Sequence, residues 1–147
     1  MTLKAQISED MKVAMRAKDA ERLGTIRLLQ AAIKQREVDE RIELTDADVI
    51  AVIEKMLKQR KDSIAAYESA NRTDLADVEK AEVTVLQSYL PQQLTDQELK
   101  DLLDKIVLDT GANSIKDMGK VMAAIKPLVA GKADMGKISG LIKARLA

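Results

Sequence analysis

The residues with the clearest capacity for chemistry are lysines near the C-terminus. Lys116 and Lys120 are one helical turn apart, and Lys132 and Lys137 lie on either side of Asp134, where a helix is expected to begin. Backbone N–H groups at a helix start, together with ammonium groups, are typical of phosphate-binding sites. Residues 111–147 also carry a net charge of +5, whereas residues 1–110 carry −5. We therefore predict these four lysines as nucleic-acid-binding residues.

Asp134 leaves a second interpretation of this segment open. Its carboxylate can accept from the same N–H groups as a helix N-cap, which would keep a phosphate away from them. Gly136 favours the phosphate, because it lets a ligand approach the backbone closely. A second basic cluster, Lys55–Lys61, lies within an expected long helix. Its cations are spread over more than one face and are partly offset by acids, which favours a solvated surface.

No catalytic residue is predicted. The chain contains no histidine and no cysteine, so it lacks the usual general base near neutral pH and the thiol nucleophile. Ser63, Ser69 and Ser88 fall in ordinary helical patterns, without the preorganised oxyanion site that a serine nucleophile needs. Glycine-rich nucleotide-binding loops are also missing. We therefore expect a protein that binds rather than one that catalyses alone, and we expect no cofactor.

No metal site is predicted either. Glu79 and Glu82 lie on neighbouring helical turns, but the di-metal sites of helical bundles also need histidine, so we interpret both as part of a solvated face. The Asp46–Asp48 segment begins like an EF-hand loop. Ala51 occupies the position that needs glycine, and Leu57 the position of the bidentate glutamate.

The composition indicates an all-α protein. The 147 residues are 46% hydrophobic, yet Tyr67 and Tyr89 are the only aromatic residues. Alanine and straight-chain residues favour helices, which need neither large rings nor β-branched runs. A chain of this length buries a substantial core.

The 3.6-residue period of apolar positions predicts seven helices in two domains. Residues 1–90 form an N-terminal helical domain, and residues 95–147 form a C-terminal three-helix bundle. Residues 37–43 are predicted to be a loop, with the alternative that its first residues are still helical. Gly111 is predicted to be a left-handed helix stop, and Pro127 with Gly131 the end of the sixth helix. The residues expected to begin the helices are Thr2, Asp19, Thr45, Asp74, Thr95, Ser114 and Asp134.

Several segments resemble the GatB/YqeY family, specifically its free-standing YqeY-like members. In order along the chain they are Ile26–Leu29 with Ala32–Lys34, Lys55–Ser63, Tyr89–Leu94, Lys116–Met122 and Gly131–Asp134. The resemblance covers essentially the whole chain. It implies a second domain like the C-terminal tail of the B subunit of tRNA-dependent amidotransferases, which helps to hold the tRNA during amidation. It also implies a link to carbon–nitrogen ligase activity with glutamine as amido donor.

Two hypotheses on function follow. In the first, the chain is a non-catalytic tRNA-binding or tRNA-amidotransferase-associated protein, and its lysines contact phosphates. A structured RNA is favoured over a single strand, because single-strand binders stack bases on aromatic rings. In the second, it is an adaptor that docks on an amidotransferase or aminoacyl-tRNA synthetase. Met118, Met122 and Met135 would supply an adaptable surface, although Met118 and Met122 share a stripe with Val121 and Ile125 that favours core packing.

The apolar pattern also leads us to expect a cytoplasmic protein that does not engage a membrane. Met1–Lys4 opens directly into a charged amphipathic pattern, without the apolar region of a secretory signal peptide. The longest apolar runs, Val49–Ile53 and Val121–Ile125, have five residues each, whereas a membrane-spanning helix needs about 20.

Overall fold

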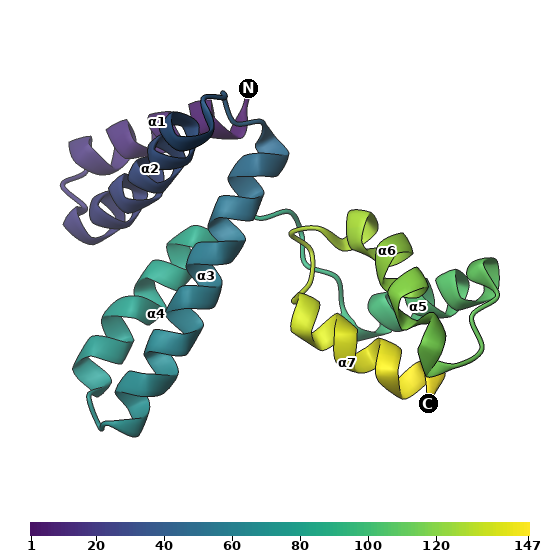
Figure 1. Cartoon of the computed structure of the whole chain (residues 1–147). Helices are drawn as coiled ribbons and strands as arrows, with labels where there is room; N and C mark the ends of the chain where they lie inside the picture. Colours follow the sequence, from purple (N-terminus) through teal and green to yellow (C-terminus); the bar gives the residue numbers. More distant parts are fainter. The chain divides into compact units, whose positions relative to one another are not determined.

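The computed structural model describes residues 1–147 and contains seven α-helices, one short 3-10 helix and no strand (Figure 1). The all-α prediction is confirmed. The chain divides into two compact units, Met1–Leu90 and Pro91–Ala147, and each unit has its own apolar core. The helices are α1 (Leu3–Arg16), α2 (Ala20–Glu40), α3 (Asp46–Ser69), α4 (Thr73–Gln87), α5 (Asp96–Thr110), η1 (Ile115–Asp117), α6 (Met118–Val129) and α7 (Met135–Leu146).

The first unit contains α1 to α4. Helices α3 and α4 lie side by side as a hairpin, and α2 contacts all three of the other helices. Apolar residues on the inward faces of the four helices form the core, and the largest that are fully buried are Ile7, Ile26, Leu29, Ile53 and Leu86. The only buried polar residue is Thr25, whose hydroxyl donates to the Glu21 carbonyl at 3.2 Å.

The second unit is built from α5, α6 and α7, with η1 against α6 and α7. Its core consists of apolar residues from all three helices, among which Val121, Ile125, Ile138 and Ile142 are almost completely buried. Gly111 ends α5 in a left-handed conformation, with a φ of 68°, as predicted. The backbone N–H of Leu94 donates to the Lys132 carbonyl at 2.9 Å, so the segment before α5 is held against the α6–α7 loop.

Most of the predicted helix starts are confirmed. Thr2, Asp19, Thr95 and Asp134 each accept a hydrogen bond from a backbone N–H in the first turn of the following helix. Thr45 forms a reciprocal capping box with Asp48. These bonds join residues two or three positions apart, so the local sequence is sufficient to specify them.

The structure refines two predicted helix ends and contradicts one predicted cap. Helix α2 takes in the first four residues of the predicted loop and ends at Glu40, where Arg41 adopts a left-handed conformation and its backbone N–H donates to the Glu37 carbonyl. The Ser114 side chain caps nothing, and η1 precedes α6. Helix α6 ends at Val129, between Pro127 and Gly131, so Pro127 lies in its last turn. Because proline has no N–H, the hydrogen bond to the carbonyl four residues earlier is absent.

Candidate nucleic-acid interface

The four predicted lysines lie at the two ends of α6. Lys116 belongs to η1 and Lys120 to the first turn of α6, whereas Lys132 lies in the loop after α6 and Lys137 in the first turn of α7. Lys116, Lys120 and Lys137 are exposed, and Lys132 is half-buried. A helix of 12 residues is about 18 Å long. The structure therefore groups the lysines as two pairs with α6 between them.

The start of α7 is occupied by the protein's own acids. The Asp134 carboxylate accepts from the backbone N–H of Gly136 at 3.0 Å, so Asp134 is a helix cap. The Lys137 ammonium pairs with the Asp96 carboxylate at the start of α5. A phosphate would have to compete with Asp96 for this lysine, and with Asp134 for the backbone donor.

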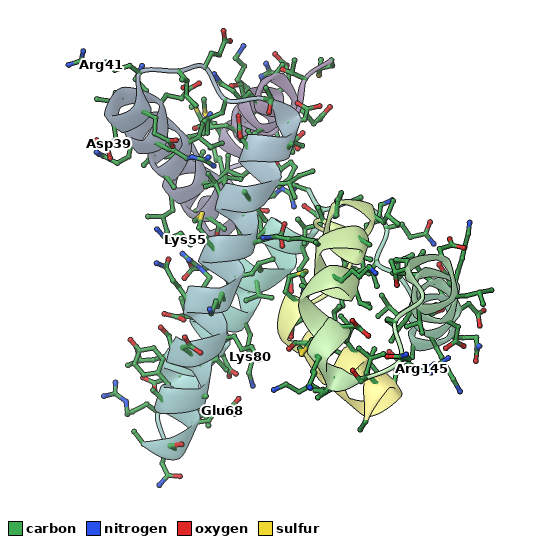
Figure 2. All side chains as sticks on the ribbon, turned by 45° about the vertical axis from the view of Figure 1, so that its right-hand side comes forward. Asp39, Arg41, Lys55, Glu68, Lys80 and Arg145 are labelled. Atoms are coloured by element: carbon green, nitrogen blue, oxygen red, sulfur yellow. The ribbon has the colours of Figure 1, made fainter.

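A second ion pair joins α5 to α7 and indicates the relative direction of the two helices. Arg145, labelled in Figure 2, contacts Asp104 of α5 with an Nε to Oδ1 distance of 3.0 Å. Arg145 lies eight residues after Lys137, and Asp104 lies eight residues after Asp96. The Lys137–Asp96 and Arg145–Asp104 pairs therefore follow one another in the same order along both helices, so α5 and α7 run parallel. Helix α5 carries a net charge of −3, and it neutralises two of the cations on α7.

Seven lysines of the second unit form no ion pair. Two of them, Lys100 and Lys105, lie on acidic α5. The other five lie in the basic segment 111–147, and we call these five the unpaired lysines: Lys116, Lys120, Lys126, Lys132 and Lys143. All are exposed except Lys132, which is half-buried. Residue-by-residue reasoning on the sequence missed Lys126 and Lys143 as site candidates. The signal for them was the charge excess of residues 111–147, to which both contribute.

The basic cluster of α3 has a structural role at Arg60. Its guanidinium contacts the Glu82 carboxylate of α4 through Nη2 at 2.8 Å and Nε at 3.2 Å. The two side chains are only 15% and 16% exposed, so this pair joins α3 to α4 below the surface. The interpretation of Glu79 and Glu82 as a solvated face is wrong: Glu82 is held by Arg60, and Oε2 of Glu79 is buried without a hydrogen-bond partner.

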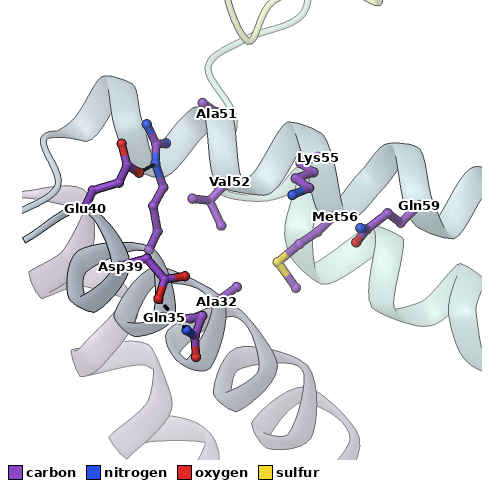
Figure 3. A pocket seen from close by; sticks show the side chains of 10 residues that line it. Ala32, Gln35, Asp39, Glu40, Ala51, Val52, Lys55, Met56 and Gln59 are labelled. Atoms are coloured by element: carbon purple, nitrogen blue, oxygen red, sulfur yellow. Dashed lines mark hydrogen bonds and ion pairs between the residues drawn. The ribbon is translucent and has the colours of Figure 1, made fainter.

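An open groove of about 740 Å³ lies between α2 and α3 (Figure 3). Helix α2 contributes Ala32, Gln35, Arg36, Asp39 and Glu40 to it. Helix α3 contributes Ala51, Val52, Lys55, Met56 and Gln59. The sequence alone did not predict this groove, because the residues on each helix look like an ordinary mixed surface until the two helices are placed together.

The methionine surface expected for an adaptor is not free. Met118, Met122 and Met135 are partly buried against the core of the second unit. No group of three or more acidic residues is gathered as metal ligands would be. None of the helices combines the length and the apolar character that crossing a membrane requires.

Comparison with known proteins identifies relatives over most of the chain. The family model described as Yqey-like protein matches residues 4–146. Three curated relatives share the name "Altered inheritance of mitochondria protein 41, mitochondrial". The one from Vanderwaltozyma polyspora is 32% identical over 120 residues, 76% of this chain and 64% of the relative. That from Pyrenophora tritici-repentis is 33% identical over 126 residues (82% and 70%), and that from Lachancea thermotolerans 34% over 125 residues (79% and 66%). The chain thus spans about two thirds of the length of these relatives.

These relatives correct the expected cytoplasmic location, because their names place them in mitochondria. The sequence argument rested on the absence of long apolar runs, which bears on secretion and on membrane spans. Import into mitochondria depends instead on amphipathic, arginine-rich segments. An argument from apolar runs therefore cannot distinguish the cytoplasm from a mitochondrial compartment.

Proposed function

Because this chain belongs to the YqeY-like protein family, we propose that it is a non-catalytic protein that binds tRNA or associates with a tRNA-dependent amidotransferase. The resemblance of its second unit to the tail of the amidotransferase B subunit supports this role. The same resemblance links the chain to carbon–nitrogen ligase activity with glutamine as amido donor. With neither imidazole nor thiol in the chain, the proposed contribution to that reaction is to hold tRNA.

The observation that carries the proposal is the separation of charge within the second unit. Acidic α5 lies on one side, and its Asp96 and Asp104 hold Lys137 and Arg145. The unpaired lysines remain on η1, α6, α7 and the loop between them, without a carboxylate to neutralise them. Cations that have no internal partner are available to phosphates, whose contacts with lysine supply sequence-independent affinity.

The two ends of α6 would then contact separate parts of an RNA backbone. Lys116 and Lys120 act at the start of this helix, and Lys132 acts beyond its end. Lys137 joins them when its ammonium exchanges Asp96 for a phosphate, which is feasible because both partners are largely exposed. A structured RNA suits this arrangement, since it offers phosphates at fixed distances without requiring stacked bases.

A salt titration of tRNA binding tests the proposal. We expect the logarithm of affinity to fall linearly with the logarithm of salt, with a slope of about 0.7 to 0.9 per contacted phosphate. The double variant K116E/K120E should bind about tenfold more weakly or worse, because two phosphate contacts become repulsive. The control is the variant K100E, which substitutes an exposed lysine on acidic α5. It should change affinity less than about twofold.

Two outcomes would contradict this proposal. One is an affinity that does not respond to salt, and the other is a K100E variant as weak as K116E/K120E. The non-catalytic part is tested separately, by incubating the purified chain with glutamine, ATP and mischarged tRNA, because a carboxylate must be activated before it can form an amide. We expect no amidated product, and turnover by the chain alone would show this part to be wrong.

A second candidate function is that of an adaptor between proteins. The groove between α2 and α3 favours it, because this hollow uses no residue of the second unit. The two functions are compatible in one chain, with RNA on the second unit and a protein on the first.

A further inference from the structure

The walls of the α2–α3 groove are the exposed edges of two helices that also contact each other. On α2, the residues Ala32, Gln35 and Asp39 recur at the spacing of one helical face, and Val52, Met56 and Gln59 do so on α3. Both helices use other faces for internal packing, since α2 contacts α1 and α3 contacts α4. The groove follows each helix over nine residues, 32–40 on α2 and 51–59 on α3, which is about 12 Å or slightly more than two turns.

The bottom of the groove is apolar and shallow. Ala32 and Ala51 have small side chains that let another backbone approach closely. Val52 and Met56 lie between them, and each is more than nine-tenths buried. A methionine thioether adapts its shape to different apolar partners. The groove therefore offers a rod-shaped ligand apolar contact mainly at Ala32 and Ala51, because Val52 and Met56 belong to the core and expose only 8% and 7% of their surface.

The α2 wall and the α3 wall of the groove carry unpaired charges of opposite sign. Arg36 is neutralised by Glu40, at 2.5 Å between Nε and Oε2, and also lies 3.7 Å from Asp48. Asp39 on α2 accepts only the side-chain amide of Gln35, at 2.9 Å, and forms no ion pair. Lys55 on α3 forms none either. Figure 3 shows Asp39 and Lys55 on opposite walls, so an unpaired anion faces an unpaired cation across the groove.

We propose that this groove binds an amphipathic helix of a protein partner, which carries a basic residue opposite Asp39 and an acidic residue opposite Lys55. Apolar side chains spaced at i, i+3 or i+4, and i+7 would lie on Ala32, Val52 and Met56, the pattern of helix-in-groove recognition. The paired charges would set the direction and register of the bound helix. This inference goes beyond the proposed tRNA binding, since it requires none of the unpaired lysines.

Peptide selection with two baits tests this proposal. The probe is a displayed library of 20-residue amphipathic helices, selected first on the full chain and then on its charge-swapped variant D39K/K55E. With the unchanged chain, we expect selected peptides to share an apolar stripe with a basic residue on one flank and an acidic residue on the other. With the variant, the two flanking charges should change places. Both substituted positions are exposed, so the fold is expected to be retained.

Affinities of synthetic versions of the selected peptides complete the test. A51E places a charged side chain in the groove and should weaken binding at least tenfold. A65E substitutes another exposed alanine of α3, outside the groove, and should leave affinity unchanged. tRNA binding should be the same in both variants, which separates a failure here from a failure of the proposed function.

Three results would overturn the proposal. The first is that the selection yields no peptide with saturable binding to the unchanged chain. The second is that A51E and A65E have equal effects. The third is that sedimentation shows the unchanged chain to be a dimer and A51E a monomer, because the groove would then be filled by a second copy.

Discussion

The two units of this chain handle charge in opposite ways. In the first unit, acids and bases are interspersed, and several ion pairs join different helices, such as Lys4 with Glu37 and Arg60 with Glu82. In the second unit, charge is separated by helix: α5 is acidic, and residues 111–147 are basic. A chain with zero net charge can thus contain one unit in which acids and bases are mixed and another in which positive charge is concentrated in residues 111–147.

One interhelical ion pair of the first unit is more deeply buried than an interhelical pair of the second. Arg60 and Glu82 are about 15% exposed, whereas Arg145 and Asp104 are about half exposed. A shielded pair is costly to break because it leaves a desolvated charge. An exposed pair contributes little and exchanges readily for another ion. The Arg60–Glu82 pair therefore maintains structure, whereas the Arg145–Asp104 pair can yield to a ligand.

The largest expected effect tests whether the two units are stable separately. Leu86 of α4 is completely buried in the first core, and Leu86→Ala should destabilise that unit by about 2–5 kcal/mol. Hydrogen exchange should show loss of amide protection in α1 to α4 and unchanged protection in α5 to α7. Ile142→Ala, at a completely buried position of the second core, should show the reverse. Equal loss in both units from either variant would mean that they unfold as one.

An intermediate effect is expected from acid on the first unit. The Lys4 ammonium donates to Glu37 at 2.6 Å and the Leu44 N–H donates at 3.0 Å, and these bonds lower the pKa of Glu37 below its ordinary value. Between the lowered pKa and the ordinary glutamate pKa, about 4.3, the unfolded chain binds more protons. The stabilisation is therefore present above about pH 4.3, and it is lost as the pH falls through the lowered pKa.

Urea unfolding of the first unit between pH 6 and pH 3 measures this contribution. The transition midpoint should fall with acid in the unchanged chain and fall less steeply in Glu37→Gln. Glu43 is the matched control, because it lies 3.9 Å from the same lysine but is 88% exposed. Glu43→Gln should follow the unchanged chain. If the two variants had the same pH dependence, the Lys4–Glu37 bond would not be the cause.

The smallest expected effect on stability comes from breaking the exposed Arg145–Asp104 pair of the second unit. Asp104→Asn should cost less than about 1 kcal/mol of stability, because the pair that it breaks is exposed. It also releases Arg145, so the slope of tRNA affinity against salt should steepen by a little under one. Asp101→Asn removes one acid of α5 that holds no cation and controls for net charge. If both variants changed binding equally, release of Arg145 would not matter.

The sequence was most informative where a structure depends on neighbouring residues. Thr45 and Asp134 were identified as caps because the N–H groups that they accept from lie within three residues. Predictions failed where distant contacts decide. In α4, for example, Val78 is 55% exposed, whereas the smaller Ala76 is buried. The predicted loop at residues 37–43 is helical as far as Glu40, and Lys4 and Leu44 hold the Glu37 side chain there.

The candidate sites divide in the same way. Composition and periodicity alone established an all-helical chain and a basic C-terminal segment, because helix propensity and charge are properties of single residues and their near neighbours. Only the tertiary structure decided which cations have partners: Lys137 meets Asp96 across 41 residues and Arg60 meets Glu82 across 22. It alone created the α2–α3 groove. Ion pairs and grooves depend on which helix faces meet, and short-range sequence patterns do not specify that.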